Sequence, residues 1–147
     1  MELCCGFLPS LVSDETLSGS FSVVIDVLRF TTVVAHALAN GCEGVLPLPS
    51  IERALAVRAE MPGVLLGGER GGAKISGFDL ANSPCEYSKE KVGGRMVAVT
   101  TTNGTVALLR CRGLAARVTT GSFVNLRGVC DLAVKAYRED GVKVSIV

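Results

Sequence analysis

The sequence is poor in aromatic side chains and has no excess of either charge. It has no tryptophan, two tyrosines, five phenylalanines and a single histidine, His36. Fifteen basic and fourteen acidic side chains leave a net charge of +1. Nucleic-acid binding needs a basic surface, and binding of single strands adds aromatic rings on which bases stack. We therefore expect no nucleic-acid partner.

Long apolar runs and targeting signals are also missing. No stretch approaches the roughly 18 apolar residues of a membrane-spanning helix. The N-terminal residues, MELCCGFLPSLVS, carry an acid where a secretory signal has a basic segment. The cysteines at positions 4, 5, 42, 85, 111 and 130 have no spacing typical of zinc ligands. We expect a cytoplasmic protein, without a membrane partner, whose cysteines serve as small core residues.

The composition and the pattern of the chain predict one α/β domain over residues 1–147. Hydrophobic residues make up 48% of the chain and charged residues 20%, as in a globular domain. Apolar β-branched runs predict strands over 22–28, 44–48, 64–66, 95–100, 116–119 and 142–147. Capped or terminated helical patterns occupy 30–40, 51–61, 84–92, 103–111 and 125–140. Their alternation predicts a three-layer α/β/α fold with a mainly parallel sheet.

Polar residues gather at the predicted carboxyl ends of the strands, where open parallel sheets bind ligands. Asp26 lies in the first predicted strand. Glu69 and Arg70 lie in the glycine-rich segment 67–72, which we expect to be a loop. The stretch TTTNGT at 100–105 begins at the end of the strand predicted over 95–100. Helix N-termini, hydroxyl groups and arginines suit an oxyanion such as phosphate. We expect Asp26, Glu69 and the 102–105 turn to share one pocket.

Missing motifs narrow the chemistry further. The P-loop pattern GxxxxGK[ST], the GxSxG elbow and a GxGxxG after the first strand are absent. Without a histidine at a strand end, acid–base work falls to carboxylates or to metal-bound water. Asp26, Glu69 and Asp79 are hard oxygen ligands that suit Mg²⁺ together with a substrate phosphate. A structural alternative, in which Asp26 and Asn103 only cap helices, stays open.

Five stretches resemble, in order, the 2-phosphosulfolactate phosphatase (ComB-like) family: VVIDVLRFTT, ALANGCEGVLPLPSIERAL, LLGGERGGAKISGFDLANSPCEY, VAVTTTNGTVAL and VTTGSFVN. The resemblance implies a Mg²⁺-dependent acid phosphatase that hydrolyses 2-phosphosulfolactate to 3-sulfolactate and phosphate in coenzyme M biosynthesis. A non-catalytic anion-binding domain and a phosphatase of another small phosphorylated acid are the alternatives.

On this resemblance, the matching residues receive roles. Catalytic roles go to Asp26, Glu69 and Asn103, and Asp26 and Asp79 would hold Mg²⁺. Substrate binding is assigned to Arg29, Thr31, Thr32, Arg70, Asn82, Ser83, Thr101, Thr102, Gly104 and Thr105. Arg29 and Arg70 would contact the anionic groups of the substrate, because a guanidinium presents a planar fork of donors.

Members of the family continue beyond the position of Val147. We therefore expect this chain to be the N-terminal portion of a longer family fold. The apolar segment 142–147 is then either a strand inside the sheet or an exposed edge strand. The resemblance favours the exposed edge, and such strands invite pairing with another chain. A homo-oligomer is the partner expected from this edge.

Overall fold

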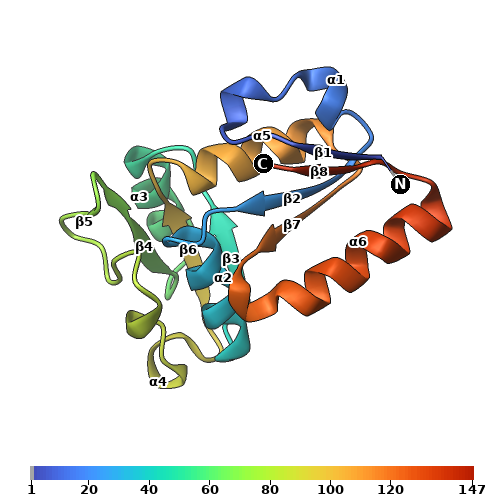
Figure 1. Cartoon of the computed structure of the whole chain (residues 1–147). Helices are drawn as coiled ribbons and strands as arrows, with labels where there is room; N and C mark the ends of the chain where they lie inside the picture. The colour runs from blue at the N-terminus through green and yellow to red at the C-terminus, as the bar shows by residue number, and fades with distance from the viewer. Residues whose placement is uncertain (1) are drawn as a thin grey trace.

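Helices flank two four-stranded sheets in the computed structural model, which describes residues 2–147 (Figure 1). The strands are β1 (Leu3–Cys5), β2 (Phe21–Ile25), β3 (Gly44–Pro47), β4 (Leu65–Arg70), β5 (Ala73–Lys74), β6 (Met96–Thr100), β7 (Arg117–Gly121) and β8 (Val144–Ile146). The α-helices are α1 (Asp14–Leu17), α2 (Phe30–Ala39), α3 (Ile51–Glu60), α4 (Lys89–Val92), α5 (Gly104–Leu114) and α6 (Leu126–Asp140). Three short 3₁₀ helices are η1 (Pro9–Leu11), η2 (Pro84–Glu86) and η3 (Phe123–Asn125).

The predicted three-layer α/β/α class with mainly parallel pairing is confirmed. The first sheet has the strand order β1-β8-β2-β7, and all of its pairs are parallel. The second has the order β3-β6-β4-β5, in which only the β4–β5 pair is antiparallel. The division into two sheets is a finding of the structure, because periodicity along the chain does not tell which strands pair.

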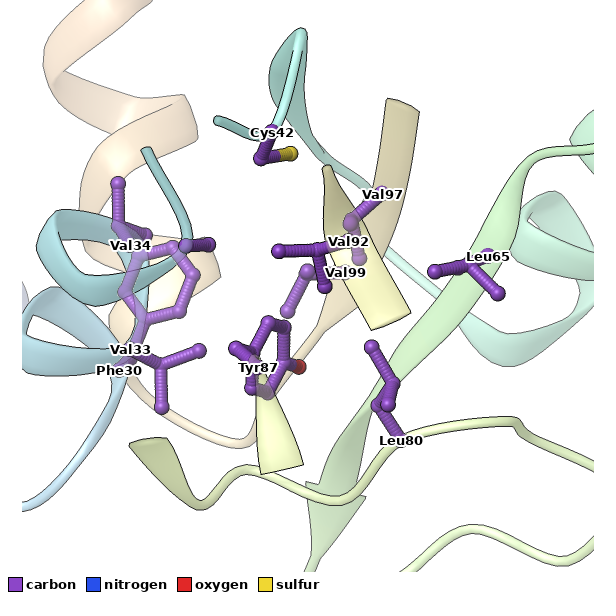
Figure 2. Packing of buried hydrophobic residues seen from close by; sticks show 11 residues of the cluster. Phe30, Val33, Val34, Cys42, Leu65, Leu80, Tyr87, Val92, Val97 and Val99 are labelled. Carbon is purple, nitrogen blue, oxygen red and sulfur yellow. The ribbon is translucent and has the colours of Figure 1, made fainter. Parts of the chain in front are cut away.

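The helices pack on both faces of each sheet. Helix α6 covers one face of the first sheet through Val129 and Ala136, and α5 covers the other face. Helix α3 covers one face of the second sheet. On its opposite face, α2 packs Phe30, Val33 and Val34 against the cluster shown in Figure 2. Since α2 follows β2 of the first sheet directly, this packing brings the carboxyl end of β2 toward the second sheet.

The structure corrects several local predictions. Strand β4 continues through Arg70 and turns at Gly71–Gly72 into β5, so segment 67–70 is not a loop. The helix expected over 84–92 is divided into η2 and α4, and Tyr87 between them is fully buried. Ser83 makes no capping hydrogen bond at its start. The short strand β1 was not predicted, because three residues carry no periodicity.

The exposed-edge prediction for segment 142–147 is wrong. Strand β8 lies inside the first sheet, paired with β1 on one side and with β2 on the other. Its backbone N–H and C=O groups are therefore used within this sheet. Among the cysteines, Cys42 and Cys111 are buried as expected, whereas the prediction of core positions is wrong for Cys5, Cys85 and Cys130, which are exposed. No helix in residues 2–147 combines the length and apolar character needed to cross a bilayer.

Close approach of β4 and β6 depends on Gly68. This glycine pairs with Thr100 of β6 and has a φ of +142°, which side-chain-bearing residues rarely adopt. A Cβ atom at this position would overlap the carbonyl oxygen of Thr100, which is backbone and cannot move aside cheaply. Glu69, the next residue, is thereby held close to the end of β6.

We expect Gly68→Ala to lower the free energy of unfolding by about 3 kcal/mol or more, because steric overlap adds to an unfavourable φ. Gly63→Ala is the matched control. Gly63 also has a positive φ, +89°, but a Cβ atom there meets nothing within 4 Å, so the cost should be about 1 kcal/mol. Urea unfolding of both variants measures the difference. Equal losses would contradict the steric argument.

Candidate functional site

A cavity of about 300 Å³ lies where the carboxyl end of β2 meets those of β4 and β6. It is lined by residues from all three strand ends and from the loop before η2. The lining residues are Asp26, Leu28, Arg29, Glu69, Gly71, Gly72, Asn82, Thr102 and Asn103. The structure thus brings together Asp26, Glu69 and the start of the 102–105 turn, as the strand-end pattern predicted. We call this space the Asp26 cavity.

Asp26 is the first residue after β2, and its backbone is fixed by Thr31. The Asp26 N–H donates to Thr31 Oγ1 at 3.1 Å, and the Thr31 N–H donates to the Asp26 carbonyl at 3.0 Å. The Thr32 hydroxyl donates to the Val27 carbonyl at 2.8 Å. These two threonines hold the β2–α2 turn, and their predicted contact with substrate stays a prediction. Within residues 2–147, the hydrogen bonds of Asp26 involve its backbone alone, so its carboxylate is free for a ligand.

The N-terminus of α5 lies against this carboxylate because Gly104 has no side chain. A Cβ atom on Gly104 would lie 2.7 Å from Asp26 Oδ2 and would overlap the Phe30 ring. The first N–H groups of a helix lack intrahelical partners, and the helix dipole makes this end attractive to anions. Asn103 makes no capping hydrogen bond through its side chain, so the capping alternative is not realised there. Its side chain is exposed at the cavity.

Glu69 connects two of the turns around the cavity. Its side chain is buried, with Oε1 accepting from the Thr102 N–H at 2.6 Å and Oε2 from the Gly72 N–H at 2.7 Å. The Thr102 hydroxyl also donates to Oε2, at 3.2 Å. Burial by itself would raise the pKa of Glu69, but these donors and nearby Arg70 outweigh it and lower the pKa below its usual value. Glu69 is therefore an ionised anchor whose oxygens are already occupied.

Arg29 faces the Asp26 cavity, whereas Arg70 does not line it. Arg29 Nη2 donates to the Gly72 carbonyl at 3.0 Å, which leaves other N–H groups of its five-donor fork for an anion. Arg70 donates through Nη1 to the Glu69 carbonyl and through Nη2 to Thr100 Oγ1, both at 2.8 Å. The guanidinium of Arg70 is thus committed to the ends of β4 and β6.

Thr101 and Thr105 hold the β6–α5 turn from inside. The Thr101 N–H donates to Thr105 Oγ1 at 3.0 Å, and the Thr105 N–H donates to Thr101 Oγ1 at 3.0 Å. Both side chains are buried and neither lines the Asp26 cavity, so their contact with substrate stays a prediction. Ser83, also predicted to bind substrate, lies outside the residues that line the cavity.

Asp79, predicted as a metal ligand with Asp26, is not brought to the cavity. Its Oδ2 atom accepts from the Leu66 N–H at 2.8 Å and pairs with Arg58. In the described part of the chain, no three His, Cys, Asp or Glu side chains gather as a metal site. Oxygen atoms of Asp26 and Asn82 are available at the cavity, and Asn82 Oδ1 is buried without a hydrogen-bond partner in residues 2–147.

A second cavity of about 420 Å³ adjoins the first and was not predicted. It shares Asp26, Thr102 and Asn103 with the Asp26 cavity and adds Gly104. The rest of its lining is largely apolar: Phe7, Leu8, Pro9, Ser10, Val24, Ile25, Val106, Ala107 and Val147. These residues come from both ends and the middle of the sequence, so no local motif indicates them.

Comparison with known proteins decides the family. The model of the 2-phosphosulpholactate phosphatase family matches residues 7–147, nearly the whole chain. The chain belongs to this family. Three of the stretches that resemble this family surround the Asp26 cavity. They form the β2–α2 turn, the β4–β5 hairpin and the β6–α5 turn.

Curated relatives agree with this membership. A probable 2-phosphosulfolactate phosphatase of Caldicellulosiruptor saccharolyticus is 45% identical over 124 residues, which are 84% of this chain and 51% of the relative. One of Thermotoga petrophila is 49% identical over 110 residues, which are 75% of this chain and 47% of the relative. The chain thus spans about half the length of the curated relatives it matches.

The role of Glu69 as an anchor predicts a pH-dependent loss of stability in Glu69→Gln. The neutral amide loses charge-assisted hydrogen bonds, so we expect a cost of about 2 kcal/mol at pH 7. Since the folded pKa is lowered, the contribution of the carboxylate is fully present above the unfolded pKa of about 4.3 and is lost as pH falls from there through the lower folded pKa. Urea unfolding of wild type and variant should therefore converge in acid. A constant difference down to pH 3 would contradict this role.

Proposed function

We propose that the Asp26 cavity carries Mg²⁺-assisted hydrolysis of 2-phosphosulfolactate to 3-sulfolactate and phosphate. The observation that supports it most is the meeting of Asp26, Arg29 and the α5 N-terminus at one cavity. A carboxylate that has no partner in residues 2–147, shares its cavity with a guanidinium and lies against a helix N-terminus suits an anionic ester and its attacking water. The names of the relatives supply the substrate, and coenzyme M biosynthesis is the route in which this reaction would belong.

Recognition of the phosphate falls to Arg29 and the helix end. A guanidinium offers paired donors that match two phosphate oxygens, and the backbone N–H groups of a helix start add further donors. The Asn103 amide lies at the same cavity and can donate to a remaining oxygen, whereas the Thr102 hydroxyl already donates to Glu69. The carboxylate and sulfonate of the substrate would then extend from this centre.

The donor chemistry of the cavity fits Mg²⁺. Proteins often hold this ion through one or two carboxylates together with substrate phosphate oxygens. Asp26 would hold the ion, because its carboxylate accepts no hydrogen bond within residues 2–147 and both oxygens are free for coordination. Bound there, Mg²⁺ would polarise the phosphoryl group and offset the charge of the phosphate.

Hydrolysis forms a bond from a water oxygen to phosphorus and breaks the ester bond between phosphorus and the substrate oxygen. Asp26 is the carboxylate at the cavity that can orient this water or accept its proton. Glu69 is unsuited to proton transfer, because its oxygens already accept from Thr102 and Gly72 and its pKa is lowered. Glu69 instead holds the turns in place. The departing substrate oxygen takes a proton from solvent water, and the proton that Asp26 accepts from the attacking water returns to solvent.

Release of phosphate from 2-phosphosulfolactate by this chain, with and without Mg²⁺, tests the function. We expect release with Mg²⁺ and none in EDTA. Asp26→Asn should abolish the release while the circular dichroism spectrum and melting temperature stay close to those of wild type. Phosphate binding by ³¹P NMR without turnover would favour the non-catalytic alternative, and full activity of Asp26→Asn would show that this carboxylate is structural.

The two arginines form a matched pair of variants. Arg29→Lys should raise KM more than about tenfold, since loss of the planar fork removes about 1.4 kcal/mol of binding. Arg70→Lys should change KM little and lower thermal stability instead, because Arg70 bonds to Thr100 and to the Glu69 carbonyl. Steady-state kinetics and melting curves separate the two effects. The reverse order of KM values would move the anion site to Arg70.

A further inference from the structure

Asn82 has a buried acceptor atom with no partner. Its side chain is 4% exposed, it lines the Asp26 cavity, and Oδ1 has no hydrogen-bond partner within residues 2–147. An unsatisfied buried polar group destabilises the fold, because it loses its hydrogen bonds to water and gains none in return. Native proteins avoid this cost unless a ligand, an ion or water fills the position. The atom therefore needs a ligand, an ion or water as its partner inside the cavity.

The partner of Asn82 Oδ1 must be a donor or a cation, because an amide oxygen only accepts hydrogen bonds. The carboxylate of Asp26, at the same cavity, is also an acceptor when ionised. The substrate of the proposed function carries phosphate, carboxylate and sulfonate, whose oxygens are again acceptors. Two acceptors facing an acceptor-rich anion repel it unless a positive charge lies between them.

We propose that Asn82 Oδ1 and the Asp26 carboxylate bind one divalent cation of the oxygen-preferring class, such as Mg²⁺ or Mn²⁺. The inference rests on the proposed function, which supplies the charges of the substrate. An amide oxygen together with a carboxylate suits hard cations. Glu69 is not the second ligand in this arrangement, because its oxygens already accept from two N–H groups and a hydroxyl. This also explains why the site contains no cluster of three acidic side chains within residues 2–147.

The backbone that carries Asn82 is clamped on both sides of Ala81. The Tyr87 hydroxyl donates to the Ala81 carbonyl at 3.0 Å, and Glu86 Oε2 accepts from the Ala81 N–H at 2.9 Å. Figure 2 shows the Tyr87 ring inside the apolar cluster, with its oxygen on the side of Leu80. Burial raises the pKa of Tyr87, so its hydroxyl stays a donor. Tyr87 is therefore a positioning residue for Asn82.

Mn²⁺ binding followed by electron paramagnetic resonance tests the cation site without substrate or turnover. We expect Asn82→Ala to weaken Mn²⁺ binding about tenfold or more, and Asn82→Asp to bind Mn²⁺ at least as tightly as wild type. Ser18→Asp is the control for added charge, because Ser18 is exposed after α1, lies outside the Asp26 cavity and has no side-chain hydrogen bond within residues 2–147. It should bind Mn²⁺ like wild type.

Asn82→Asp decides the matter even if Asn82→Ala fails to fold. Weaker Mn²⁺ binding in Asn82→Asp would overturn the proposal and show that the amide N–H₂ group faces an anion instead. Absence of Mn²⁺ binding by wild type would also overturn it. If the Asn82 variants change Mn²⁺ binding as expected but the wild-type chain releases no phosphate, only the proposed function is refuted. If the chain releases phosphate but Asn82→Ala binds Mn²⁺ like wild type, only the role of Asn82 as a cation ligand is refuted.

Tyr87→Phe tests the positioning role through Mn²⁺ affinity, which a purely structural role of the hydroxyl would leave unchanged. The variant keeps the ring in the core and loses the bond to Ala81, so Mn²⁺ affinity should fall severalfold. Tyr137→Phe, on the exposed side of α6, is the control and should leave affinity unchanged. A lower melting temperature of Tyr87→Phe with wild-type affinity would show that the hydroxyl serves stability only.

Discussion

The carboxylate of Glu69 is the contact on which the geometry of the site depends. It lies at the end of β4 and accepts from backbone N–H groups on two different turns, at Gly72 and Thr102. A buried charge is costly unless it is well paired, and here it is paired with two backbone N–H groups and the Thr102 hydroxyl. One side of the cavity therefore consists of backbone held in place by Glu69. The Asp26 carboxylate and the Arg29 guanidinium, which line the same cavity, have fewer hydrogen bonds to the protein.

The two sheets supply different parts of this arrangement. The first sheet brings Asp26 at the end of β2, and the second brings Glu69 and Thr102 at the ends of β4 and β6. Helix α2 joins them, since it begins just after Asp26 and buries Phe30 and Val33 in the core of the second sheet. Gly104 then lets α5 reach the Asp26 carboxylate. The relative placement of the turns thus follows from apolar packing and from a missing side chain.

Much of the fold and part of the site could be predicted from the sequence. Apolar runs and capping residues located most strands and helices, and the strand-end rule brought Asp26, Glu69 and Asn103 to one cavity. The rule did not tell which polar residues face a ligand: Thr31, Thr101 and Thr105 turn inward to bond backbone. Arg70 and Asp79 find protein partners that are distant in sequence, Thr100 and Arg58. Such pairings depend on three-dimensional neighbours, which a single sequence does not reveal.

The interior position of β8 has a consequence for the order in which the chain can assemble. The second sheet uses residues 44–100 alone, whereas the first needs Val144–Ile146 between β1 and β2. Contacts between distant segments form later than local ones, because closing a long loop costs entropy. During synthesis on a ribosome, the second sheet can form while β1 still lacks its neighbour. Glu69 and Thr102, at the ends of β4 and β6, would then be in place before β2, which carries Asp26, pairs with both of its neighbours β7 and β8.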